Sequence, residues 1–188
     1  MTEHDGITSD LRSREEDYFR RKDRELVEKL RQAAADNEAR HALEKTSGIH
    51  DQALLQELQA LGFTPETVSL LPLIPIVQVA WAEGGVTDEE RSLIVQFARQ
   101  RGIHAGSAAD RELSAWLQHR PSDEVFAKAG RLIRAMLDAP HRAGADIDDL
   151  IKHCEEIAAA SGGVLGFRKI SAEERALLGR IEAALKSS

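Results

Sequence analysis

The sequence predicts an all-α fold: a helical bundle with approximate two-fold internal repetition, preceded by a long charged helix. Hydrophobic residues make up 42% of the 188 residues but aromatic residues only 4%, so the core must be mainly aliphatic, which suits closely packed helices. Helix-capping signals recur along the chain. Two similar helix–turn–helix segments, at residues 79–91 and 157–175, indicate a repeated architecture.

The N-terminal part is expected to be a disordered tail over residues 1–10 and then a charged helix over residues 11–47. This helix contains no Gly or Pro, and opposite charges lie four residues apart, as in Glu16 and Arg20. Its apolar positions form a narrow stripe that is too irregular for a sustained coiled-coil repeat. The stripe consists of Leu11, Tyr18, Phe19, Leu26, Leu30 and Ala33.

Residues 48–188 are expected to form a single helical domain of about eight helices. Leucines spaced three and four apart, followed by Gly62, predict a helix at residues 51–61. Thr64-Pro65 opens a short helix that leads into an apolar helix at residues 73–83. Cap and breaker residues then bound the remaining helices, which we expect at residues 88–101, 108–119, 123–138, 146–160 and 172–185.

Two of these helices begin with a capping box, in which a hydroxyl residue is followed three positions later by glutamate. The pairs are Thr87 with Glu90 and Ser171 with Glu174. They occupy equivalent places in the two repeated segments, so acidic side chains are expected at two equivalent helix joints.

Bulk properties exclude several classes of function. A formal charge of −7 argues against nucleic-acid binding, which requires a basic surface. The single cysteine, Cys154, excludes an intrachain disulfide framework. The most apolar run, residues 68–82, is too short to span a bilayer, and no basic-apolar leader precedes it. We therefore expect a cytoplasmic protein that binds neither nucleic acid nor membrane.

The first joint combines acids with a flexible turn. Glu83 is expected at the end of its helix, where the dipole opposes a negative charge, and Asp88 and Glu90 begin the next helix after Gly84-Gly85. Such oxygen ligands suit a hard cation such as Ca²⁺ or Mg²⁺. At the second joint only Glu173 and Glu174 are available. Binding is expected to be weak, and without a cation the carboxylates should remain solvated. In the alternative interpretation the acids only cap their helices.

The segment over residues 70–97, which contains Ala-Trp-Ala-Glu-Gly-Gly-Val-Thr-Asp-Glu-Glu-Arg, resembles the signature of the tellurite-resistance TerB-like family. The resemblance covers about residues 50–187 and implies a non-enzymatic protein linked to stress or tellurite resistance, with a metal at the acidic joints. The implied metal ligands are Glu83, Glu90 and Glu174, with Asp88 as a supplementary donor. The chain departs from the family pattern at Glu83, which is longer than the usual aspartate, and at Gly85, Ser161 and Gly163, which lack the family's acids.

A second hypothesis requires no metal. Here the chain is an interaction scaffold, and Tyr18, Phe19, Leu26 and Leu30 serve self-association or docking of a partner protein. No nucleophile–base arrangement or metal-hydrolase pattern is visible, so an enzyme is not predicted.

Three further residues carry specific structural expectations. Adjacent helical positions point about 100° apart, so His153 and Cys154 are not expected to chelate one ion together. Cys154 follows the apolar pattern of its helix and should face the core. Trp81 should be buried, and its indole N–H then needs an acceptor.

Overall fold

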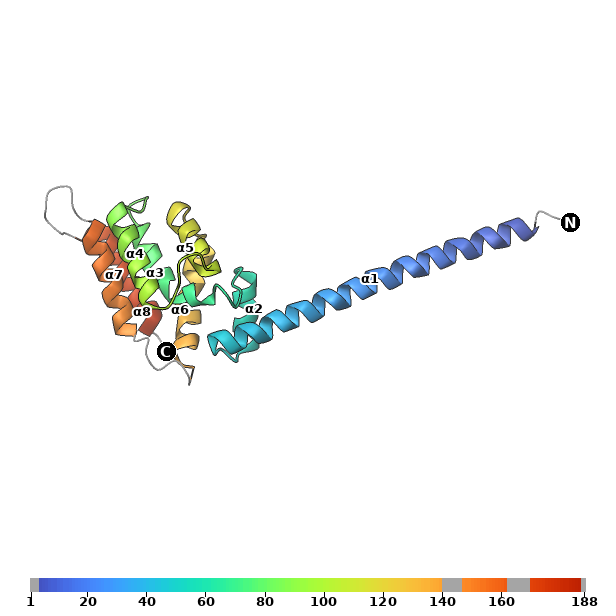
Figure 1. Cartoon of the computed structure of the whole chain (residues 1–188), viewed down its shortest axis with the longest axis horizontal. Coiled ribbons are helices and arrows are strands. Elements are labelled where there is room, and N and C mark those ends of the chain that lie inside the picture. Colours follow the sequence, from blue (N-terminus) through green and yellow to red (C-terminus); the bar gives the residue numbers. More distant parts are fainter. Residues whose placement is uncertain (1–3, 140–146, 162–169, 187–188) are drawn as a thin grey trace. The chain divides into compact units, whose positions relative to one another are not determined.

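The computed structural model describes residues 4–139, 147–161 and 170–186, and all regular structure within them is helical (Figure 1). The predicted all-α class and long N-terminal helix are therefore confirmed. In chain order the elements are α1 (His4–Ser47), α2 (Gln52–Ala60), the 3₁₀ helix η1 (Val68–Leu73), α3 (Ile74–Ala80), α4 (Asp88–Gln100), α5 (Ala108–Gln118), α6 (Asp123–Leu137), α7 (Ile147–Ser161) and α8 (Ala172–Lys186).

The chain divides into two compact units, Met1–His41 and Ala42–Ser188. The first unit is most of α1. Its charged residues lie along a solvated helix, where Arg20 pairs with Glu16 at 3.4 Å as expected and Lys22 pairs with Glu25 at 3.5 Å. The helix begins at His4, before the expected start at residue 11. Gly6, the only strong helix breaker in that stretch, costs a helix only about 1 kcal/mol relative to alanine.

The second unit is built around α3. This short helix packs against α6, α7 and α8, and α7 also packs against α4 and α8. All but one of the α3 side chains are buried, and so are most of those in η1, which gives the aliphatic core that the composition predicts. Cys154 on α7 is fully buried, so its predicted core position is confirmed.

The stretch before the first joint differs from the prediction of a short helix followed by an α-helix over residues 73–83. Residues Val68–Leu73 are 3₁₀-helical, and α3 ends at Ala80. Pro72 lies inside the first of these segments and Pro75 in the first turn of the second. Because proline has no N–H and clashes with the preceding turn, a continuous α-helix cannot run through this stretch.

The other helix boundaries lie close to the predicted ones, because the capping signals act locally. Asp51, Ser107 and Ser122 each accept a backbone N–H at the start of their helices. Some predicted features lie outside the described residues: the breakers Pro140 and Gly144, the cap at Asp146, and the Gly162-Gly163 turn of the second joint. Within the described part of the chain, no helix is both long enough and apolar enough to cross a membrane.

Candidate functional site

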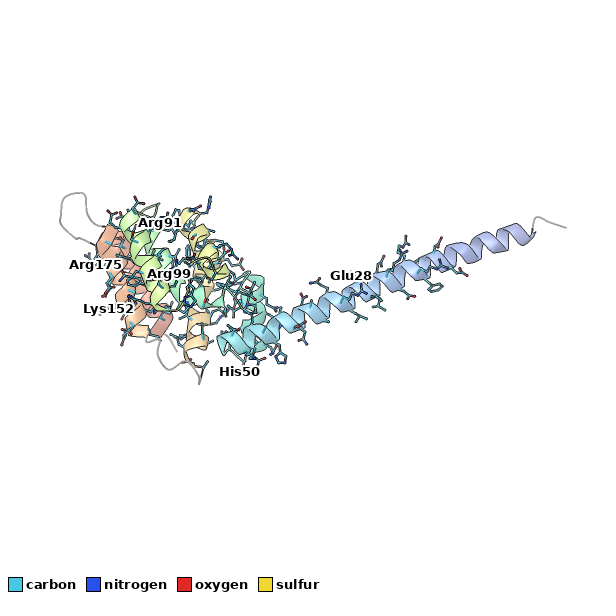
Figure 2. All side chains as sticks on the ribbon, in the orientation of Figure 1. Glu28, His50, Arg91, Arg99, Lys152 and Arg175 are labelled. Carbon is cyan, nitrogen blue, oxygen red and sulfur yellow. The ribbon has the colours of Figure 1, made fainter. Side chains whose placement is uncertain are left out.

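The first joint connects α3 to α4 through a turn closed by a complete capping box. The Thr87 backbone N–H and hydroxyl both donate to Glu90 Oε2, at 2.8 and 2.9 Å, and the Glu90 N–H donates to Thr87 Oγ1 at 3.2 Å. Arg91 follows, and its guanidinium donates to the Leu117 carbonyl at 2.8 Å (Figure 2). The predicted box is thus confirmed, and it points the glutamate back toward the helix start.

The start of α8 repeats this arrangement. The Ser171 N–H donates to Glu174 Oε2 at 2.7 Å, and the Glu174 N–H donates to Ser171 Oγ at 3.1 Å. Arg175 follows, as Arg91 does in the first joint, and it also donates to a backbone carbonyl, that of Ile170, at 3.3 Å (Figure 2). The repetition predicted from the sequence therefore extends to the hydrogen bonds at the two helix starts.

The acidic side chains of the two joints interact electrostatically. Burial raises the pKa of Glu90 above its usual value, the hydrogen bonds from Thr87 oppose that shift, and the negative charges of Glu174 and Glu83 add to it. Three of the four predicted site residues therefore interact through their charges. Asp88, the fourth, is exposed and does not take part in this coupling.

The expectation that these carboxylates remain solvated is wrong for two of them. Glu90 and Glu174 are each only 1% exposed, whereas Glu83 and Asp88 are exposed. The capping box is the cause, because it folds the glutamate side chain back against the backbone of the N-cap residue, three positions earlier. Glu83 also lies in the turn after α3 and not in a helix, since α3 ends at Ala80.

The acids do not form a ready-made metal cage. Among the described residues no group of three or more His, Cys, Asp and Glu side chains is arranged to hold a metal ion. A shallow open hollow does lie over the first joint, lined by Glu83, Glu90, Thr87 and the turn from Gly84 to Val86. In Gly84 the backbone has φ of +89°, a conformation that glycine adopts without strain. Two acids line this hollow, the exposed Glu83 and the buried Glu90.

The predicted stripe on α1 consists of exposed side chains. Tyr18 is 48% exposed, Phe19 60%, Leu26 56% and Leu30 61%. Val27, at 45%, belongs with them but was not predicted. Tyr18 and Phe19 meet edge to face with centroids 5.7 Å apart, and Arg21 and Lys22 flank the tyrosine ring. In the described part of the chain, every large apolar side chain that is exposed belongs to this stripe.

The remaining expectations concern packing residues. The Trp81 indole N–H donates to the Trp116 carbonyl at 2.8 Å, which supplies the required acceptor, although the ring is only partly buried. Burial raises the pKa of the Cys154 thiol to about 12, so it is not a nucleophile near neutral pH. The His153 ring lies 4.1 Å from that of Phe97, and its Nδ1 atom is buried without a hydrogen-bond partner in the described structure.

One feature of the second unit was not predicted. Arg180 of α8 lines two neighbouring hollows together with Gln78 of α3. In the sequence Arg180 is one of many charged residues on amphipathic helices, and no local pattern indicates which residues of α3 lie near it. Only the packing of distant helices reveals it.

Comparison with known proteins yields no match: no family model, no curated protein and no solved structure is significantly similar to this chain.

Proposed function

We propose that this chain is a non-enzymatic, TerB-like helical protein that docks a partner protein through the apolar stripe on α1. The observation that carries the proposal is the concentration of exposed large apolar side chains on one helix, over residues 18–30. On a soluble protein such a patch, flanked by charged residues, is typical of an interaction surface. The link to stress or tellurite resistance is proposed on the family resemblance alone, and the cytoplasmic location on that resemblance together with the composition of the chain.

The positions of the stripe residues around α1 indicate the kind of partner. With about 100° between successive residues, Phe19, Leu26 and Leu30 lie within roughly 40° of one another. Tyr18 lies about 100° to one side of Phe19, and Val27 about 80° to the other. The five side chains thus cover close to half of the helix circumference, which a groove in a partner surrounds better than a single opposing helix does.

The magnitude of the interaction follows from the exposed area. A fully buried apolar side chain contributes about 1.5–3 kcal/mol, so three side chains that are about 60% exposed contribute on the order of 3–5 kcal/mol. Association itself costs about 4–15 kcal/mol. The central three residues offset only the lowest part of that range, so a stable complex must also cover Tyr18 and Val27. We therefore expect weak self-association and tighter binding to a protein with a matching groove.

Site-specific photo-crosslinking tests this proposal. A benzoylphenylalanine is placed at position 19 of the full chain and, as a control, at Glu28, which is labelled in Figure 2. Nine residues at about 100° each place position 28 about 180° around the helix from position 19. In an extract of the organism of origin, the probe at position 19 should give a discrete adduct that Leu26→Gln and Leu30→Gln abolish. An adduct of twice the chain mass would identify self-association. The same adducts from both probe positions, or none from position 19, would refute docking through the stripe.

A second candidate function is weak binding of Ca²⁺ or Mg²⁺ at the acidic joints, and it can coexist with the first. The observation that favours it is the coupling of the buried Glu90 with Glu174 and Glu83. A cation bound in the hollow over the first joint would offset the repulsion between Glu90 and Glu83, the two acids that line it. Each capping box occupies Oε2 of its glutamate, so an ion at this site would have to engage the other oxygens.

Calorimetric titration with calcium tests the second candidate. The intact chain should bind with a dissociation constant on the order of a millimolar, and Glu83→Gln/Glu90→Gln should not bind. The matched control is Glu89→Gln/Glu112→Gln, which removes two exposed carboxylates and should bind like the intact chain. If the intact chain gives no heat at millimolar calcium or magnesium, or if the control loses binding equally, the acids serve only as helix caps.

A further inference from the structure

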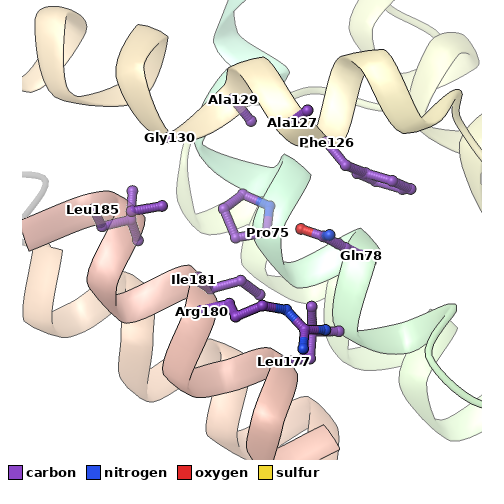
Figure 3. A pocket seen from close by; sticks show the side chains of 11 residues that line it. Pro75, Gln78, Phe126, Ala127, Ala129, Gly130, Leu177, Arg180, Ile181 and Leu185 are labelled. Carbon is purple, nitrogen blue, oxygen red and sulfur yellow. The ribbon is translucent and has the colours of Figure 1, made fainter. Parts of the chain in front are cut away.

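A half-open cavity of about 160 Å³ lies within the second unit, between α3, α6 and α8. Its walls are mostly apolar, with Pro75 from α3, Phe126 from α6, and Leu177, Ile181 and Leu185 from α8 (Figure 3). These five side chains are buried. Arg180 and Gln78 supply the polar groups of the wall (Figure 3).

A second, more polar hollow adjoins this cavity. It shares Gln78, Leu177 and Arg180 with the cavity and adds Trp81, Arg120 and Glu173. The two hollows therefore form one groove, defined here as the α3–α8 groove, with an apolar end and a polar end. Arg180 stands where the two ends meet.

The two arginines of the groove differ in their partners. Arg120 pairs with Asp123 at 2.6 Å, and its guanidinium lies 5.0 Å from the Phe126 ring centroid. Arg180 has no ion pair with any described carboxylate, although Glu173 lines the same polar hollow. A guanidinium beside an apolar cavity favours an anionic ligand that also carries an apolar group, because guanidinium binds carboxylate through two parallel hydrogen bonds.

We propose that the α3–α8 groove binds a small carboxylic acid with an aromatic or short aliphatic tail. The tail occupies the cavity beside Phe126 and Ile181, and the carboxylate pairs with Arg180 and accepts a hydrogen bond from the Gln78 amide. The size is suitable, since apolar protein cavities of about 150 Å³ bind benzene. The nearby Glu173 disfavours anions of higher charge, such as phosphate, so a single carboxylate is the best match.

The test is a titration of the ¹⁵N-labelled full chain with 3-phenylpropanoate, followed by NMR. We expect saturable shifts confined to α3, α6 and α8, with a dissociation constant on the order of a millimolar, as the ligand's size allows. The neutral analogue 3-phenylpropan-1-ol should bind at least about fivefold more weakly than the acid, because it lacks the charge that Arg180 recognises. The absence of saturable shifts up to about 10 mM acid, or equal binding of acid and alcohol, would overturn the proposal.

Variants separate the two ends of the groove. Arg180→Gln should weaken binding of the acid at least about fivefold and leave binding of the alcohol unchanged. Ala184→Phe, at an exposed position in the cavity wall, should weaken binding of both ligands. The control is Arg175→Gln, an exposed arginine on the same helix outside the groove, which should bind like the intact chain.

Two further results would count against a small free acid as the ligand. Equal weakening by Arg180→Gln and Arg175→Gln would show that only the general positive charge of α8 matters. Binding of an acetylated peptide that ends in phenylalanine, if at least tenfold tighter than that of the free acid, would show that the groove recognises a peptide C-terminus. If Ala184→Phe perturbs the fold, the comparison of acid and alcohol on Arg180→Gln alone decides the question.

Discussion

Replacement of Gly48 by alanine should destabilise the second unit by about 2–4 kcal/mol. Gly48 follows the last residue of α1 with φ of +75°, and its N–H donates to the Glu44 carbonyl at 2.8 Å. An alanine in this left-handed conformation costs about 1 kcal/mol. Its Cβ would also lie 2.8 Å from Ala139 Cβ, where carbon atoms normally keep about 3.5–4.0 Å. The forced shift adds about 1–3 kcal/mol.

The matched control is Gly62→Ala. Gly62 has nearly the same backbone, with φ of +84°, but no described atom lies within 4 Å of an added Cβ. That variant should lose only about 1 kcal/mol. Urea unfolding followed by the fluorescence of Trp81 and Trp116, both in the second unit, measures the two losses. Ala139→Gly should recover part of the loss in Gly48→Ala. Equal losses for the two glycine variants would refute the steric part of the reasoning.

Three other predictions concern the site and its surroundings. Because burial raises the pKa of Glu90, the folded chain binds this proton more readily than the unfolded chain, so the group's contribution to stability grows as pH falls from the raised folded-state pKa to 4.5. Urea unfolding at several pH values measures the free energy of unfolding of both proteins. The advantage of Glu90→Gln over the intact chain should be largest near neutral pH, and an advantage that does not vary with pH would contradict this. His153→Leu should raise the free energy of unfolding by about 1 kcal/mol, since it removes a buried Nδ1 atom that has no hydrogen-bond partner in the described structure. A lower urea midpoint for this variant would show that the imidazole, which packs on Phe97, stabilises the fold. Trp81→Phe should cost about 1 kcal/mol in chemical unfolding through the lost bond to the Trp116 carbonyl, and no change would mean that water replaces it.

The sequence predicted the features of this fold that depend on neighbouring residues. The capping boxes at Thr87 and Ser171 are examples, because the spacing of hydroxyl and glutamate is sufficient to define their hydrogen bonds. The apolar stripe of α1 is another, since an exposed helix position depends only on its own helical period. The structure shows both capping boxes and the part of the stripe from Tyr18 to Leu30 as predicted, and it adds Val27 to that part.

The features that depend on distant residues could not be predicted. The interaction between Glu90 and Glu174 arises from two joints far apart in the sequence, and neither joint alone indicates that the other is near. The same holds for Arg180, whose place beside Gln78 depends on how α8 packs on α3. The 3₁₀ segment before α3 is a local feature, but its competing signals mislead: a strongly apolar run favours one helix, and two prolines interrupt it.

The burial of Glu90 and Glu174 also favours a role for their negative charge in addition to their role in helix capping. A capping box accepts glutamine as well as glutamate, and a neutral amide at position 90 would keep an acceptor for the Thr87 N–H and hydroxyl. Two carboxylates instead add the cost of burial and of mutual repulsion. The hydrogen bonds of the capping boxes offset part of that cost, and uptake of a proton by Glu90 or of a cation at the acidic joints would offset more of it. Glu90→Gln/Glu174→Gln should therefore fold at least as stably as the intact chain in the absence of metal, yet lose any stabilisation by added calcium. If the double variant is much less stable in metal-free buffer, the carboxylates are needed for the fold itself, and their burial no longer favours an ion at this site.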